Sequence, residues 1–330
     1  MPRVAVVFTG GTISMRASIA GNEPALRGEA LLETVPELAQ LADLDIIDWG
    51  LVPGSHLSFD DVLSIGRVAG EQLARDEIDG CVIVQGTDNI EETAFAWDLL
   101  PMPAKPVVVV GAMRSASQRG YDGPDNLLNA VAAAAAPELS EAGVTVALGA
   151  ELHGADAVRK THTHAYDTFK SPGAGRIGLV ADGDVVIERT RHPYRLPTAP
   201  SRAERVVILT ALLGGVDEAV EEALRDDPPP GLVVEAMGGG NTQAQLLELA
   251  VSLMAAGTDV VLTTRTSAGR VRPGYGFPGG SSTWWEAGAI FAGTLGGLKS
   301  RVALALALGA GIDREGLLGL FGWYGGGAKA

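Results

Sequence analysis

The stretch that most constrains the fold is VAVVFTGGTI, residues Val4–Ile13. Its first five residues are all apolar, which predicts a strand buried on both faces. The strand ends at Gly10 and Gly11, which can turn through conformations closed to other residues and bring bare backbone N–H groups close to a ligand. A hydroxyl residue after such a turn stands at the carboxyl end of a strand, where open α/β folds place their sites. Thr12 is therefore a candidate for chemistry, although the threonines of the turn could instead only cap backbone groups.

Similar apolar runs alternate with helical patterns along the rest of the chain. A second buried strand, Ile78–Gln85, also ends in a glycine and a hydroxyl residue, Gly86-Thr87-Asp88. Further strands are expected at Leu44–Ile47, Lys105–Gly111, Val144–Leu152, Ile177–Val180, Val185–Glu188, Val206–Thr210, Leu232–Ala236 and Val260–Thr264. This alternation predicts an α/β protein with two parallel-sheet domains: a larger N-terminal flavodoxin/Rossmann-like domain and a smaller C-terminal α/β domain. We place them at residues 1–190 and 206–330, because residues 191–205 hold three prolines and no periodicity and are typical of a linker.

Several local patterns give expectations that a structure can test. Leucines at helical spacing predict a helix over Glu29–Ala42, after a polar loop over Arg16–Arg27. Ser58 with Asp61 predicts a capped helix start, and Asp88 with Glu91 resembles a second one. Strand register over Lys160–His164 would put His162 and His164 on one face, but ordinary polar strand positions explain them better than a metal site.

Composition excludes several classes of function. The net charge of −15 and a pI near 4.7 argue against a nucleic-acid partner, because the phosphate backbone needs a basic surface. The longest strongly apolar run, Val302–Ile312, is too short to span a bilayer. No charged-then-apolar leader precedes the first strand. The sole cysteine, Cys81, lies in an apolar run and is expected in the core. We therefore expect a cytoplasmic protein with neither a membrane nor a nucleic-acid partner.

The order of the motifs resembles that of the bacterial L-asparaginase/glutaminase family over nearly the whole chain. The motifs are Thr9-Gly10-Gly11-Thr12-Ile13, Gln85-Gly86-Thr87-Asp88, Gly111-Ala112-Met113-Arg114, Asp122-Gly123-Pro124, the Asp156–Thr161 segment with its lysine, and Gly293-Thr294-Leu295. The first motif alone is a moderate signal, whereas the series in this order is a strong one.

The resemblance implies a chemistry that agrees with the residues present. Amide hydrolysis needs a nucleophile, a base and donors for the developing oxyanion. By resemblance, Thr12 forms an acyl-enzyme, and Thr87 is bridged to Asp88 and Lys160. A lysine can act as a base only when burial or neighbouring charge holds it largely neutral. Backbone N–H groups of the two glycine turns would bind the oxyanion, no cofactor or metal is implied, and the remaining substrate-binding residues would be Gly11, Ser55, His56, Gly86 and Asn241.

The family's quaternary structure and one departure from its pattern follow from the same resemblance. The family forms homotetramers or homodimers with active sites at subunit interfaces, where Asn241 would complete the site of a neighbour. The family carries a tyrosine in the loop after the first motif, whereas the first tyrosine here is Tyr121. Tyr275, in a long glycine-rich loop, is a candidate replacement, but it could instead pack on neighbouring aromatic residues. Glu286 is the nearest match to an acid of the family's C-terminal domain.

The function expected from these residues is that of an L-asparaginase, which releases L-aspartate and ammonia from L-asparagine. A glutaminase-asparaginase of mixed specificity and a non-catalytic amino-acid binder on the same scaffold stay open as alternatives. A nucleotide-binding oxidoreductase is disfavoured because no G-x-G-x-x-G follows the first strand. A tRNA-amidating subunit resembles a longer chain with an extra N-terminal domain.

Overall fold

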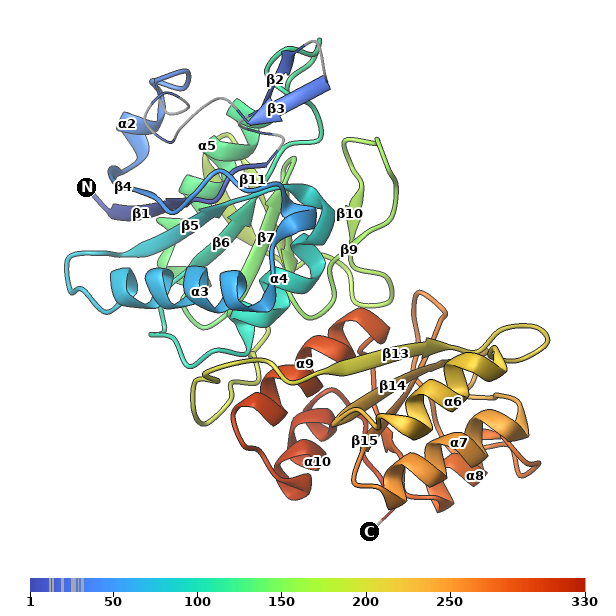
Figure 1. Cartoon of the computed structure of the whole chain (residues 1–330). Coiled ribbons are helices and arrows are strands. Elements are labelled where there is room, and N and C mark those ends of the chain that lie inside the picture. Colours follow the sequence, from blue (N-terminus) through green and yellow to red (C-terminus); the bar gives the residue numbers. More distant parts are fainter. Residues whose placement is uncertain are drawn as a thin grey trace. The chain divides into compact units, whose positions relative to one another are not determined.

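The computed structural model describes residues 1–11, 13, 15–18, 21–24, 28, 30 and 33–329. The chain divides into two compact units, Met1–Pro197 and Thr198–Ala330 (Figure 1). The expected nucleophile, Thr12, lies outside the described residues.

The first unit is built on an eight-stranded sheet with the strand order β12-β11-β8-β7-β6-β5-β1-β4. Five of its strands run parallel: β4 (Asp43–Asp48), β1 (Arg3–Phe8), β5 (Gly80–Val84), β6 (Val107–Val110) and β7 (Val144–Leu148). The other three extend one edge in antiparallel fashion: β8 (Glu151–Gly154), β11 (Gly178–Ala181) and β12 (Asp184–Ile187). The α/β fold class is confirmed, with an antiparallel edge added to the parallel strands.

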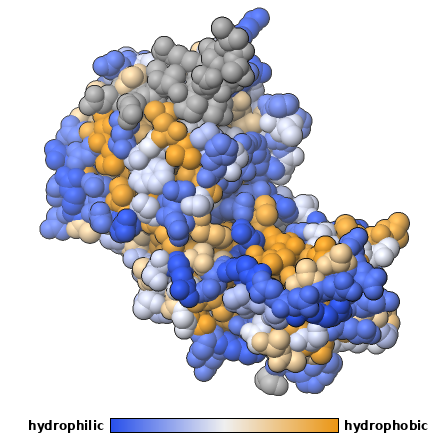
Figure 2. Space-filling model, viewed as in Figure 1, coloured by the Kyte–Doolittle hydropathy of each residue, from blue (hydrophilic) through white to orange (hydrophobic). Residues whose placement is uncertain are grey.

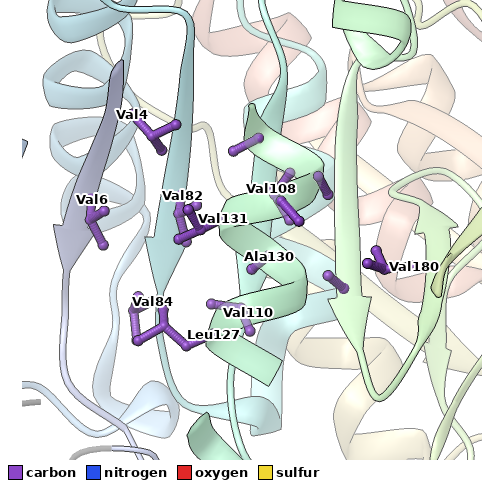
Figure 3. Packing of buried hydrophobic residues seen from close by; sticks show 14 of the residues in the cluster. Val4, Val6, Val82, Val84, Val108, Val110, Leu127, Ala130, Val131 and Val180 are labelled. Carbon is purple, nitrogen blue, oxygen red and sulfur yellow. The ribbon is translucent and has the colours of Figure 1, made fainter. Parts of the chain in front are cut away.

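Helices cover both faces of this sheet. α3 (Phe59–Leu73) and α4 (Ile90–Asp98) lie on one face, and α5 (Gly123–Ala134) lies on the other (Figure 1). Valines of β1, β5 and β6 point toward α5, where they pack against Leu127, Ala130 and Val131 (Figure 3). This apolar packing fixes the strands whose carboxyl ends carry the sequence motifs.

The expected cap of α3 is present. The Asp61 N–H donates to Ser58 Oγ over 3.2 Å, and the Ser58 N–H donates to Asp61 Oδ2 over 2.9 Å. The hydrogen bonds from Ser58 lower the pKa of Asp61. Cys81 is fully buried, as the apolar run predicts.

Four local expectations about the first unit are wrong. The expected strand Val144–Leu152 breaks at Gly149, where a φ of +60° lets the chain reverse into the β7–β8 hairpin. The expected helix Glu29–Ala42 is not continuous in its described part: residue 30 is helical, residues 33–37 form turns, and α2 (Leu38–Leu41) follows. The expected loop over residues 16–27 contains a short hairpin of β2 (Met15–Ser18) and β3 (Gly21–Pro24) in its described part. The strand at Lys160–His164 ends at Lys160.

The end of that last strand changes the environment of the two histidines. β9 (Arg159–Lys160) pairs with β10 (Phe169–Lys170), and the chain turns between them. His162 Nδ1 accepts the N–H groups of His164 and Ala165 in this turn, each over 3.0 Å. The His162 ring therefore closes the turn and does not share a strand face with His164.

The second unit has a four-stranded parallel sheet in the order β13-β14-β15-β16. The strands are β13 (Val206–Thr210), β14 (Gly231–Ala236), β15 (Asp259–Thr264) and β16 (Ile290–Phe291). The helices are α6 (Glu218–Asp226), α7 (Ala244–Ala255), α8 (Ser281–Glu286), α9 (Gly297–Gly309) and α10 (Arg314–Trp323). The parallel sheet expected of the C-terminal half is confirmed.

The surface is largely hydrophilic on the visible face of each unit, and patches of apolar residues lie among the hydrophilic ones (Figure 2). In the second unit the Leu213 side chain is 99% exposed, and Tyr275 and Phe277 are about half exposed. Within the part of the chain that the structure describes, no helix has the length and apolar character needed to cross a membrane.

Candidate active site

The two glycine turns at the carboxyl ends of β1 and β5 pack backbone against backbone. Gly11 has a φ of +93°, and a Cβ added there would lie 2.1 Å from the Gly86 nitrogen. Gly10 has a φ of +109°, and a Cβ there would lie 2.7 Å from the Val52 nitrogen. Neither position has room for a side chain, so Gly11 is required for the two turns to meet and Gly10 for the close approach of Val52.

A lysine from a distant hairpin reaches the second turn. Lys160 Nζ donates to Thr87 Oγ1 and to Asp88 Oδ1, each over 2.9 Å. The Thr87 residue is 5% exposed and the Lys160 side chain 18%, whereas the Asp88 side chain is 69% exposed. The Thr87 hydroxyl thus lies in a buried residue, whereas the Asp88 carboxylate faces solvent.

Local structure holds the partners of this contact in place. The Phe169 side chain, opposite Lys160 in the β9–β10 pair, is buried. The Thr161 N–H donates to the Thr168 carbonyl over 2.8 Å and continues the hairpin. A Cβ on Gly111, at the end of β6, would lie 2.9 Å from Thr87 Cγ2, so this glycine leaves the room that Thr87 occupies.

The interpretation of Asp88 as a helix cap is wrong. Thr87–Asn89 forms a short 3₁₀ turn, η3, and α4 begins after it at Ile90 without a side-chain cap. The Asp88 carboxylate is thereby left to pair with Lys160. Asn89, which the sequence did not single out, donates from Nδ2 to the Gly54 carbonyl over 2.6 Å.

That hydrogen bond joins the second turn to the segment that carries Ser55 and His56. Gly54–His56 forms another 3₁₀ turn, η2, and a Cβ on Gly86 would lie 3.1 Å from the Gly54 nitrogen. Ser55 and His56 are both exposed. Their exposure beside Gly86 leaves both side chains accessible to a ligand.

Asp122 supports the loop after β6 in a way that the sequence did not indicate. Its carboxylate accepts the N–H groups of Met113 and Arg114 over 3.0 and 2.9 Å. The sequence suggested only a helix start at this position. The signal that could have found the link is the pairing of the Gly111–Arg114 motif with Asp122-Gly123-Pro124 a few residues later.

The other candidate residues lie in the second unit. Asn241 ends the glycine turn after β14, and its buried Oδ1 accepts no hydrogen bond from the residues that the structure describes. The Tyr275 ring packs 6.0 Å from the Phe277 ring, and Trp285 contacts Phe291. Glu286 pairs with Lys329. Among the described residues of the whole chain, no three His, Cys, Asp or Glu side chains are grouped so that they could hold a metal ion.

Comparison with known proteins identifies the scaffold. A family model described as "Asparaginase, N-terminal" matches residues 3–193, and one described as "Glutaminase/Asparaginase C-terminal domain" matches residues 205–321. The chain belongs to the asparaginase family. The resemblance inferred from the order of the motifs is thereby confirmed.

Asparaginase relatives match over almost the full length. A probable L-asparaginase of Deinococcus radiodurans is 37% identical over 326 residues, covering 97% of each chain. L-asparaginase 2 of Bacillus subtilis is 30% identical over 334 residues, covering 98% of this chain and 87% of the relative. A crystal structure of a probable cytoplasmic L-asparaginase from Campylobacter jejuni superposes with a TM-score of 0.86 at 30% identity, covering 97% of this chain and 99% of that one.

Proposed function

We propose that this asparaginase-family protein is an L-asparaginase, which hydrolyses the side-chain amide of L-asparagine to L-aspartate and ammonia. The observation that carries the proposal is Lys160, whose amine lies 2.9 Å from both the Thr87 hydroxyl and the Asp88 carboxylate. This set stands beside two touching glycine turns, at the sheet edge where such folds bind ligands.

The proposed reaction begins at Thr12, which follows Gly11 directly. The Thr12 hydroxyl oxygen attacks the amide carbon, the C–N bond breaks, and the amide nitrogen takes up the proton that the hydroxyl gives up and leaves as ammonia. Water then hydrolyses the Thr12 ester, which releases aspartate and restores the hydroxyl. Lys160 in its neutral form can take a proton from the Thr87 hydroxyl. Backbone N–H groups at Gly11 and Gly86 are the proposed donors to the oxyanion.

The proposed substrate contacts come from several segments. Ser55, His56 and Asp88 would hold the α-amino and α-carboxyl groups, and Asn241 of a partner subunit would complete the site. The exposed apolar side chains of the second unit, Leu213 among them, support an association into a homodimer or homotetramer. Tyr275 and Glu286 stay candidates for a site shared between subunits.

A mixed glutaminase-asparaginase is the second candidate, because the family model for the C-terminal half carries both activities in its description. We further propose a cytoplasmic location, as in the printed name of the Campylobacter jejuni protein. A relative from Haemophilus influenzae, 33% identical, is named periplasmic, so fractionation of cells that produce the natural protein is the direct test.

Ammonia release from L-asparagine, L-glutamine and D-asparagine tests the function. We expect L-asparagine to be the best substrate.

In Thr12→Ala, kcat should fall by about 10⁴-fold or more while the unfolding midpoint is kept, because the nucleophile is gone. Substantial turnover by a well-folded Thr12→Ala protein would move the role of nucleophile to Thr87. Parent protein that binds L-asparagine without releasing ammonia would indicate the amino-acid binder, and sedimentation of a fully active monomer would contradict the shared site.

A further inference from the structure

Two tyrosine hydroxyls make hydrogen bonds that hold the loop between β6 and α5, and one of these bonds joins the loop to the end of the first glycine turn. Tyr121 Oη donates to the carbonyl of Ile13 over 2.7 Å, across 108 residues of sequence. Tyr166 Oη, from the turn of the β9–β10 hairpin, donates to the carbonyl of Gly120 over 2.7 Å. The first of these hydrogen bonds reaches the residue that directly follows the proposed nucleophile.

The Tyr121 ring is held in one place by its neighbours. A Cβ added at Gly123 would lie 2.3 Å from Cζ and Oη of the ring, so the ring occupies the space that this glycine leaves open. The next residue, Asp122, is anchored by the N–H groups of Met113 and Arg114. The ring also packs at the margin of the apolar core that joins the sheet and α5.

The Tyr121 hydroxyl keeps its proton and can therefore act as a hydrogen-bond donor. Burial, assisted by the charge of Asp122, raises the pKa of Tyr121 to about 12. The phenol therefore keeps its proton throughout the neutral range and can donate to a carbonyl there. Because the hydroxyl is engaged with a backbone carbonyl, it acts on the turn through the main chain.

We propose that Tyr121 is a positioning residue for the amidase reaction: its hydroxyl fixes the carbonyl of Ile13 and with it the exit of the first glycine turn. The inference rests on the proposed function, because it assigns a consequence to the placement of the neighbouring nucleophile. A displacement of a reacting group by about 1 Å is enough to lower a rate about 10²-fold. The substrate contacts proposed at Ser55, His56 and Asp88 belong to other segments, so binding should change little.

Tyr166 provides a matched control. Its hydroxyl makes an equally short hydrogen bond to the same loop, and its ring stacks on Arg114, with the guanidinium carbon 4.2 Å from the ring centre. It is exposed and makes no hydrogen bond to the first turn among the described residues. The hairpin that carries it is also held by hydrogen bonds between Thr161 and Thr168, so the loss of one hydroxyl should leave Lys160 in place.

The test compares Tyr121→Phe with Tyr166→Phe, since each change keeps the ring and removes one hydroxyl. For Tyr121→Phe we expect kcat on L-asparagine to fall about 10- to 100-fold, with KM within about threefold of the parent value. The unfolding midpoint should stay within about 3 °C of the parent, because one hydrogen bond is lost. For Tyr166→Phe we expect kcat within about twofold of the parent.

A second measurement follows the hydrogen bond between Tyr121 and Ile13 without measuring activity. Amide hydrogen exchange of a peptide covering residues 9–13 should accelerate in Tyr121→Phe and not in Tyr166→Phe. Parental kcat in Tyr121→Phe, or equal losses in the two variants, would overturn the proposal. A parent enzyme that releases no ammonia from any amide would overturn the proposed function and the positioning role together. An active parent with an unaffected Tyr121→Phe variant would overturn only the positioning role.

Discussion

The sheets of the two units end alike but hold different groups at their carboxyl edges. In the first unit the turns after β1 and β5 touch, and Lys160 reaches the turn after β5 from an antiparallel hairpin. In the second unit the turn after β14 closes on itself: the Asn241 N–H donates to the Met237 carbonyl over 3.0 Å, and Thr264 Oγ1 donates to the Gly238 carbonyl over 2.7 Å. The carboxyl ends of a parallel sheet thus bring loops together in both units. The grouping of Thr87 and Asp88 with an amine depends on Lys160, which comes from the β9–β10 hairpin and not from a strand of the parallel sheet.

The largest effect that tests this comparison is expected at Lys160. Lys160→Met removes the amine that joins Thr87 to Asp88, and we expect kcat to fall by about 10³-fold, within the range for loss of a general base. Lys170→Met is the matched control, because Lys170 belongs to the same hairpin but pairs with Glu151 and Asp167, each over 3.4 Å. Activity of the control should stay within about twofold of the parent. Equal losses of activity in the two variants would contradict a specific role for Lys160.

A smaller and mainly structural effect is expected from added methyl groups in the two sets of turns. Gly11→Ala would place its Cβ against the Gly86 backbone at a φ of +93°, and we expect a loss of about 3 kcal/mol in the free energy of unfolding, together with loss of activity. Gly238→Ala, at a φ of +48° with open space around it, should cost only about 1 kcal/mol. Urea unfolding measures both, and equal costs would contradict the tight contact between the first unit's turns.

The smallest effect concerns pH and the antiparallel edge of the first sheet. Burial lowers the pKa of His153, whose Nδ1 lies 2.9 Å from Ser171 Oγ and whose Nε2 lies 3.3 Å from Glu151 Oε2. The opposing charges nearby are Glu151, which favours the protonated ring, and Lys170 and Arg176, which disfavour it. The unfolded chain therefore binds this proton more readily, so stability is present above a pH of about 6.5 and is lost as the pH falls below it.

The slope from this one group is at most about 1.4 kcal/mol per pH unit. His153→Asn should reduce the fall in the unfolding midpoint between about pH 7 and pH 5. The second unit, residues 198–330, contains no histidine and should lack this dependence. An unchanged pH profile in His153→Asn would show that the ring is not the group that titrates.

The elements set by local sequence were predictable. The apolar runs of β1, β5 and β6 have no stable place except a sheet buried on both faces. The capping box at Ser58 involves residues three apart. The hairpin turn between β11 and β12 uses positive φ at both Asp182 and Gly183, which the sequence marks as turn residues. The helix expected over residues 29–42 shows the limit: Val35 and Leu38 are buried in the core as their spacing suggests, but turns at residues 33–37 interrupt the helix. Pro36 accounts for this break, because proline disfavours the helical conformation of the residue before it.

The sequence by itself thus determined most of the parallel strands, their glycine turns and the family, and its motifs marked Thr87, Asp88 and Lys160 as candidates. The family resemblance implied that Lys160 meets Thr87, but no local pattern joins these residues, and the tertiary structure brings them together across 73 residues. Only the tertiary structure decided that the Tyr121 hydroxyl meets a carbonyl 108 residues away. The reason is physical: a strand or a turn is stabilised by neighbours a few residues apart, whereas these contacts depend on the path of the whole chain. The Lys160 contact depends on the reversal at Gly149 and on the return of the β9–β10 hairpin to the carboxyl ends of the strands. The Tyr121 contact depends on the strand order that puts β1 and β6 on either side of β5. No local pattern carries the direction of the hairpin's return.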